Sequence, residues 1–171
     1  MVRVLTVMLS VAVAAVLVPA RGDATMVKRL PLEAVVARAA RIVHGTVVEV
    51  QSGRDDVGLP STWVTLDVAE TLKGQSGERV TFKQFGVHVP LSDGTITGVP
   101  GLPRYKVGDE VVLFLHAPSV RGFTSPVGLG QGCYHVSRPG AAPMARDAFR
   151  RAPRRLDILL STVRRLTRGD D

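Results

Sequence analysis

The residues most able to do chemistry lie in one stretch, VGLGQGCYHV (127–136), where three glycines at alternate positions precede Cys133, the only cysteine of the chain. Such residues could form a phosphate-binding loop, a thiol nucleophile with a histidine base, or a metal centre. A phosphate loop needs backbone N–H groups that converge at the N-terminus of a helix. Here the glycines lead into CYHV, which is typical of a strand, and no Gly-Lys-Ser/Thr follows. The pattern therefore argues against nucleotide binding.

A Cys/His hydrolase would use Cys133 as its nucleophile. Four histidines could serve as the base, because the geometry of nucleophile and base is spatial rather than sequential: His44, His88, His116 and His135. His135 lies two residues from Cys133 on the expected strand, a spacing that is common without any chemistry. We favour a buried, inert thiol that packs as a small apolar side chain, and keep the hydrolase as the alternative.

Metal and acid–base sites find less support in the sequence. None of the histidines belongs to an HxH or HExxH pattern, which would place two ligands on one element. The adjacent carboxylates of Asp55 and Asp56, and of Asp109 and Glu110, point apart on an extended chain. We assign no catalytic residue, no metal ligand and no cofactor.

Residues 1–24 have the form of a secretory signal peptide. Arg3 precedes an uncharged, mainly apolar run from Val4 to Val18, and small residues follow. Cleavage after Ala20 or after Ala24 fits; an uncleaved membrane anchor is the alternative, although the run is short for a bilayer span. A single cysteine forms no intramolecular disulfide, which suits a compartment that does not require them. We expect a periplasmic or extracellular protein.

The body, residues 25–138, reads as a helix followed by short strands. The helix is expected within 30–43, where Leu32, Val35, Val36 and Ala39 recur at helical spacing. Strands are expected over 42–50, 62–74, 79–85 and 108–117, with two more within 121–138, and loops over 51–61 and 86–105. Such a chain predicts a mainly β fold: a small antiparallel OB-like barrel of five to six strands, with a short N-terminal helix and a basic amphipathic C-terminal helix.

Two strands carry more specific signals. Gly45 has no side chain to pack and predicts a bulge or a sharp bend within 42–50. The run over 108–117 is apolar at consecutive positions, which indicates a central strand that is covered on both faces.

The last part of the chain, residues 139–171, is expected to be a Pro/Ala linker (139–143) and an arginine-rich helical tail. Residues 138–171 hold nine arginines against four aspartates, whereas 25–137 hold eleven basic against ten acidic residues. The basic charge therefore belongs to the tail, which argues against a nucleic-acid-binding domain.

The helix expected over 154–168 has a leucine-rich face with arginines opposite. It could pack its apolar face on the body, or meet an anionic membrane surface or an acidic partner. The candidate contacts for the second role are Arg150, Arg151, Arg154, Arg155, Arg164, Arg165 and Arg168.

Three patches, taken in order, resemble a known group. They are V-x-G-x-V at Val43–Val47, LKG at Leu72–Gly74 and VGDEVVLFL at Val107–Leu115. Together, over about residues 30–138, they resemble exported bacterial proteins of uncharacterised function and, more distantly, the netrin-like, OB-type barrel of tissue inhibitors of metalloproteinases. The resemblance implies that architecture and the use of barrel loops to bind proteins. It does not imply inhibition, because those inhibitors present an N-terminal cysteine that this chain lacks.

The leading functional hypothesis is an exported, non-enzymatic β-barrel module that binds another extracytoplasmic protein, with a peptidase as one candidate. Long irregular loops in compact domains are more often functional than idle. The binding loop is expected to be 86–105, with Val87, His88, Thr95 and Tyr105 as candidate contacts, or else 51–61. The alternatives are the Cys133 hydrolase and a module tethered to anionic surfaces by its tail.

Overall fold

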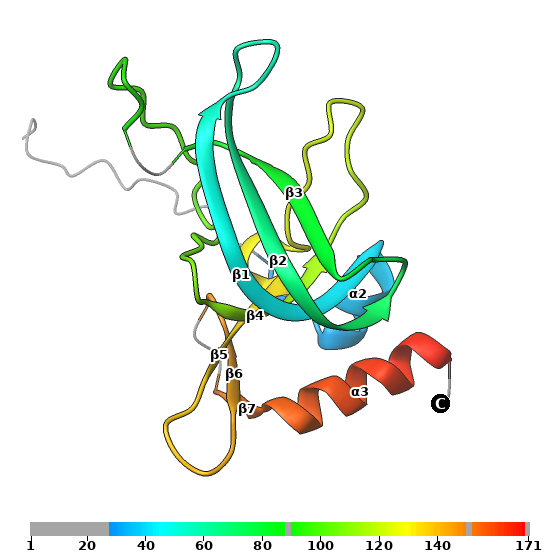
Figure 1. Ribbon diagram of the computed structural model, residues 1–171. Helices are drawn as coiled ribbons and strands as arrows, with labels where there is room; N and C mark the ends of the chain where they lie inside the picture. Colours follow the sequence, from blue (N-terminus) through cyan, green and yellow to red (C-terminus); the bar gives the residue numbers. More distant parts are fainter. Residues whose placement is uncertain (1–27, 88–89, 150–151, 170–171) are drawn as a thin grey trace, which may run out of the picture.

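The computed structural model of the protein describes residues 28–87, 90–149 and 152–169, so the expected signal peptide lies outside the described residues. Over these ranges the chain is mainly β, with seven strands in one antiparallel sheet of order β3-β2-β1-β4-β5-β6-β7 and two α-helices (Figure 1). In chain order the elements are α2 (Leu32–Arg38), β1 (Arg41–Arg54), β2 (Pro60–Lys73), β3 (Arg79–Phe85), β4 (Glu110–Leu115), the 3₁₀ turn η2 (Leu129–Gly132), β5 (Cys133–Ser137), β6 (Met144–Asp147), β7 (Arg154–Arg155) and α3 (Leu156–Arg168).

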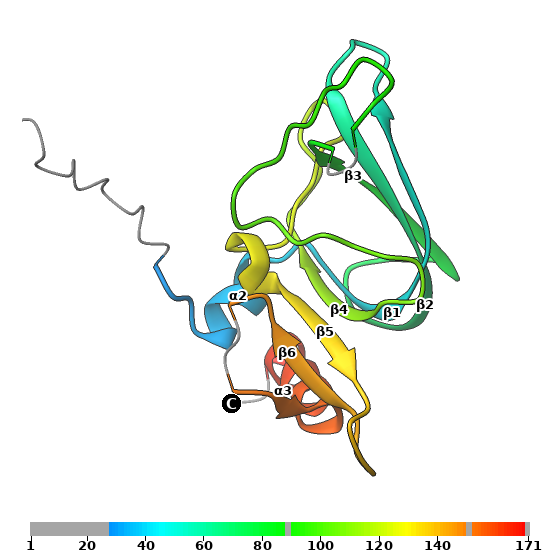
Figure 2. The same cartoon turned by 90° about the vertical axis from the view of Figure 1, so that its left-hand side faces the viewer.

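The β1–β2 hairpin is long and strongly bent. Its register shifts at three places along β1, one of them between His44 and Gly45, which confirms the irregularity predicted at that glycine. A Cβ on Gly45 would lie 2.3 Å from the carbonyl oxygen of Asp67 on β2, so only glycine fits. Bulges bend a strand and increase its twist, and β1, β2 and β3 accordingly curl around one side of the molecule (Figures 1 and 2).

Two hydrophobic clusters lie on opposite faces of the central strands. The inner core fills the curl of the sheet: Val43, Val47, Val64, Leu66, Phe82, Tyr105, Val111, Leu113, Leu115 and Cys133. The helix-side core packs α2 and α3 on the other face: Leu32, Val35, Val36, Ala39, Ile42, Leu72, Val112, Phe114, Val127, Tyr134, Ala145, Leu156, Leu159, Leu160 and Val163. Consecutive residues of β4 enter the two cores alternately, which confirms that this strand is covered on both faces.

The sheet does not close into the predicted barrel. The expected first strand within 121–138 is absent from the strands of the described chain; residues there make only isolated bridges, between Phe123 and Lys83 of β3 and between Pro126 and Leu115 of β4. Proline has no N–H to donate to a ladder, and the glycines that follow form η2 rather than extended chain. What the structure shows is therefore a curled sheet with β3 as one edge.

The C-terminal region shares this sheet. Residues 139–143, predicted as a linker, form the loop between β5 and β6, which pair from Tyr134–Asp147 to Ser137–Met144. Ala145 of β6 and the leucine face of α3 are buried in the helix-side core, which explains why the region docks. The structure thus confirms the amphipathic helix. It lies beside the rest of the fold (Figure 2), and its apolar face is buried in the helix-side core.

The stretch 127–136 combines a tight turn with a strand. η2 precedes β5, and a Cβ on Gly132 would lie 2.7 Å from both the N and the O atom of Val127. The backbones therefore approach as the glycines suggested, and Cys133 is fully buried, as predicted. Within the described ranges, neither helix is both long enough and apolar enough to cross a membrane.

Candidate functional site

Three turns gather at one end of the curled sheet: 55–59 between β1 and β2, 91–97 after β3, and 117–123 after β4 (Figures 1 and 2). Each presents one exposed aliphatic side chain. Val57 is 60% exposed, Ile96 is 63% exposed and Val120 is fully exposed. We call these three turns the loop end.

Arg54 ties two of the turns together. Its guanidinium donates to Asp93 Oδ2 from Nη2 at 2.5 Å and from Nε at 3.1 Å, and to Thr95 Oγ1 at 2.8 Å. Hydrogen bonds from Thr95 and Arg54 hold the pKa of the Asp93 carboxyl well below its usual range. The loop predicted over 51–61 is shorter than expected, because β1 runs to Arg54 and β2 begins at Pro60, which leaves only the turn 55–59. Through Arg54 this turn and the 86–105 loop form parts of one surface rather than alternatives.

Lys83 anchors the β1–β2 turn to the third turn. Its ammonium lies 3.1 Å from the buried Asp55 carboxylate and 4.2 Å from the ring centroid of Phe123. Desolvation opposes ionisation of Asp55, but hydrogen bonds from Leu59 N–H, Lys83 and Val57 N–H keep its pKa below the usual value. A cation held between a carboxylate and a ring face fixes both turns.

The predicted contact residues of the 86–105 loop occupy different environments. Val87 is fully buried and pairs with Thr97, while Tyr105 belongs to the inner core, where its ring meets Phe82 edge-on at 5.6 Å. Thr95 is half-buried and accepts a hydrogen bond from Arg54. His88 lies outside the described residues.

The side chains that this end exposes are instead Val57, Ile96 and Val120. Sequence reasoning missed them. Their turns are rich in Gly, Asp, Ser or Pro, but two of these turns also hold the half-buried Leu59 and Leu91, so the local pattern alone does not single out the exposed residues.

Cys133 and His135 lie close together without forming a reactive pair. The Sγ–Nε2 distance is 3.6 Å, but the thiol is fully buried, and this burial raises its pKa well above the usual value. A nucleophilic cysteine needs the opposite, a lowered pKa and access to substrate. The Tyr105 hydroxyl beside it is likewise held neutral, because burial and the neighbouring thiol raise its pKa.

The other histidines are dispersed. His44 Nε2 lies 2.9 Å from Glu110 Oε1, and the same carboxylate binds Arg138. His116 is exposed on the turn after β4. The described ranges contain no group of three or more His, Cys, Asp or Glu side chains that could hold a metal ion.

The arginines of the tail divide into paired and unpaired groups. Arg164 forms a two-point ion pair with Glu70 of β2, at 2.6 and 2.7 Å, and Arg155 pairs with Asp157. Arg154, Arg165 and Arg168 are exposed, and their side chains make no ion pair with any residue that the structure describes. Arg150 and Arg151 lie outside those residues.

Comparison with known proteins adds no relative. No protein-family model, no curated protein and no solved structure matches the chain.

Proposed function

We propose that this chain is an exported, non-enzymatic β module that binds another extracytoplasmic protein through its loop end. The observation that carries the proposal is the Arg54 fork, which joins two turns and leaves Val57 and Ile96 exposed on a fixed frame. A surface that is ordered before binding loses less conformational entropy on association. A peptidase remains one candidate partner, on the strength of the resemblance to the inhibitor barrels alone.

We also propose that the curl is an incompletely closed OB-like barrel. Thr124 N–H donates to Lys83 O of β3, and Val127 N–H donates to Phe114 O of β4, both at 2.8 Å. Residues 123–127 therefore run between β3 and β4, where a closing strand of such a barrel would lie. Export is inferred from the form of residues 1–24.

Capture from periplasmic or secreted fractions tests the binding function. The bait is the protein without residues 1–24, and the test variant is Ile96→Asp. Ile158→Asp is a matched control, because Ile158 on α3 is 55% exposed and lies outside the loop end. We expect the wild type and Ile158→Asp to retain one partner that Ile96→Asp loses. Recovery of no partner at micromolar bait, or equal loss with both variants, would overturn the proposal.

A second candidate function is attachment to an anionic surface. Arg154 of β7 is exposed, and so are Arg165 and Arg168, which α3 presents on a face turned away from the core. Deletion of 139–171 is a poor test, because it would remove β6, β7 and α3 from the fold. Arg165→Glu with Arg168→Glu reverses the charge without touching the core and should abolish salt-sensitive binding to vesicles rich in anionic lipid. Unchanged binding would exclude this function.

A further inference from the structure

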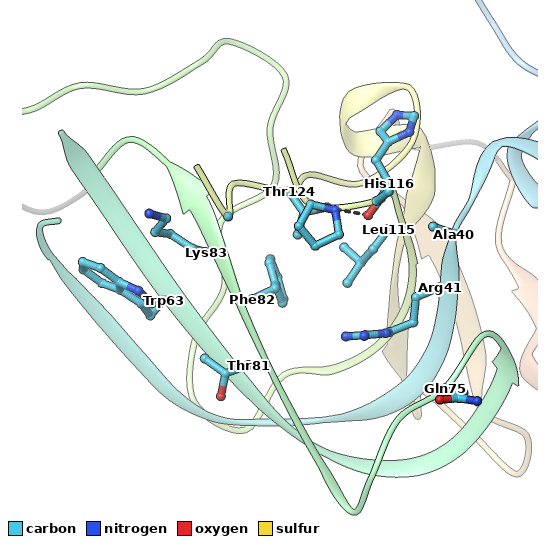
Figure 3. A pocket seen from close by; sticks show the side chains of 13 residues that line it. Ala40, Arg41, Trp63, Gln75, Thr81, Phe82, Lys83, Leu115, His116 and Thr124 are labelled. Carbon is cyan, nitrogen blue, oxygen red and sulfur yellow. Dashed lines mark hydrogen bonds between the residues drawn. The ribbon is translucent and has the colours of Figure 1, made fainter. Parts of the chain in front are cut away.

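A cavity of about 340 Å³ opens between β3 and the paired ends of β1 and β4 (Figure 3). Phe82 and Leu115, which are 5% and 2% exposed, belong to the inner core and line it, and Trp63 of β2 flanks them. This cavity is the place where the curled sheet fails to cover its own core. Its volume is at the lower end of the range of about 300–1,000 Å³ that is usual for ligand sites.

The upper end of the cavity is closed by a fixed roof. Thr124 Oγ1 donates to the carbonyl of His116 at 2.7 Å, the bond drawn in Figure 3, and Thr124 N–H donates to the carbonyl of Lys83 at 2.8 Å. The roof thus joins β3 to the chain that leaves β4. Below it, the rest of β3 has no neighbouring strand on this side among the described residues.

The ladder between β2 and β3 determines which backbone groups of β3 face this gap. Gly86 N–H donates to Pro60 O, and Val68 N–H donates to Glu78 O, both at 2.8 Å. Because hydrogen-bonded pairs alternate along an antiparallel ladder, the even-numbered residues of β3 bond to β2. Thr81, paired with Thr65 between them, directs its N–H and C=O away from β2, toward the cavity that it helps to line. Unpaired edge groups of this kind are a template for another strand.

Arg41 supplies an uncompensated charge at the same place. Its side chain is half-buried, lines the cavity and extends into it beneath Leu115 (Figure 3). It makes no side-chain hydrogen bond or ion pair with the residues that the structure describes, whereas Lys83 across the cavity is neutralised by Asp55. A partly desolvated guanidinium is satisfied best by a carboxylate.

We propose that this gap binds an extended acidic peptide segment of a partner protein. The segment pairs its backbone with Thr81, buries one apolar side chain against Phe82 and Leu115, and directs a carboxylate to Arg41. Strand addition of this kind obtains affinity from backbone hydrogen bonds and specificity from a side-chain pocket. The inference rests on the proposed function in that the partner is a protein. The cavity adjoins the loop end, whose 117–123 turn contributes Ala117, Pro118 and Gly122 to the lining, but Val57 and Ile96 do not line it.

The test uses phage-displayed random linear decapeptides, selected on the folded protein and then synthesised. We expect the selected peptides to share an apolar and an acidic residue and to bind with amide shift changes at Arg79 and Thr81. Arg41→Gln should weaken binding about tenfold or more, as expected for a lost charged hydrogen bond. Arg104→Gln, an exposed arginine outside the cavity, should change it less than about twofold.

Further variants distinguish peptide binding in the cavity from binding at the loop end and from pairing between two copies of the chain. Thr81→Pro removes an outward N–H without removing a backbone hydrogen bond to β2, although it loses the exposed hydroxyl contact with Thr65. It should therefore also abolish peptide binding in a folded protein, and Thr81→Val, which loses only that hydroxyl contact, should retain it. Ile96→Asp should leave peptide binding intact, because Ile96 does not line the cavity. No enrichment, equal binding by Arg41→Gln, or a wild-type dimer in light scattering that Thr81→Pro dissociates would overturn the proposal, the last in favour of pairing between two copies.

Discussion

The helix-side core and the inner core lie on opposite faces of the same strands, but they are covered in different ways. On one face, α2 and α3 lay apolar side chains over the sheet, so that Leu159 and Val163 of α3 are fully buried. On the other face the sheet must curl back to cover itself, and it does so incompletely beside Phe82. The candidate binding cavity of this molecule therefore lies where the sheet has to provide its own cover.

The largest test of this comparison is truncation of one phenylalanine in each core. Phe114→Ala in the helix-side core should lower the free energy of unfolding by about 3–5 kcal/mol, because surrounding side chains cannot fill the space. Phe82→Ala should cost less, since its side chain borders the open cavity and water can replace part of it. Urea unfolding of both variants measures the difference. Equal losses would contradict the claim that only one core is sealed.

The next test adds a methyl group instead of removing a ring. Gly132→Ala should lower the free energy of unfolding by about 1–3 kcal/mol, because its Cβ would lie 2.7 Å from the backbone of Val127, which cannot move alone. Gly140→Ala is the matched control: nothing lies within 4 Å of its Cβ position in the β5–β6 loop. In thermal unfolding, the melting temperature of Gly140→Ala should be unchanged or slightly higher than that of the wild type. An unchanged stability of Gly132→Ala would mean that the turn before β5 is loosely packed.

A smaller effect is expected from the ion pair between Arg164 of α3 and Glu70 of β2, which lies beside the helix-side core. The Arg164 hydrogen bond lowers the pKa of the Glu70 carboxyl in the folded protein, so the pair stabilises the fold at neutral pH. That stability is present above the usual glutamate pKa and is lost as the pH falls through the lower, folded pKa.

Arg164→Gln should therefore lower the free energy of unfolding by about 0.5–1 kcal/mol near pH 7, a small loss because both side chains are partly exposed. At a pH low enough to protonate Glu70, the substitution should no longer change the free energy of unfolding. Urea unfolding of wild type and variant between pH 7 and pH 3 measures this convergence. A constant difference across that range would show that the ion pair does not hold α3.

The smallest signal is expected from Cys133. It belongs to the inner core and does not line the cavity, and its raised pKa keeps the thiol protonated. An aromatic disulfide reagent at pH 8 should label no thiol in the folded protein and one in urea. Rapid labelling of the folded state would show that the inner core is open at a second place, and would revive the hydrolase alternative.

Much of the fold could be predicted because periodicity reports burial directly. The alternation around Val64 and Leu66 placed β2, and the consecutive apolar run of β4 indicated two covered faces. The helical spacing of Leu156 and Leu159 likewise gave α3. In each case the local pattern and the tertiary environment agree.

The rest depends on contacts that no local pattern encodes. The order of residues 121–138 predicted two strands, but isolated bridges and a 3₁₀ turn replace the first of them, and the barrel stays open. The ion pair between Arg54 and Asp93 joins segments about forty residues apart, and no local pattern in either segment predicts it. The irregular composition of 86–105 predicts that Val87 and Tyr105 are surface contacts, but an irregular loop can still bury its apolar side chains, and both residues are buried.

The position of β1 at the centre of the sheet also has a consequence for folding order. β1, β2 and β3 are consecutive, so their pairing closes only short loops, whereas Arg41 of β1 pairs with Leu115 of β4 across a long stretch of chain. Contacts of short sequence separation form at lower entropic cost. We expect the three-strand meander to form first and β4 to join it later, so that both cores are completed in a single late step. Kinetic analysis would then give Val64→Ala a higher φ-value than Leu113→Ala.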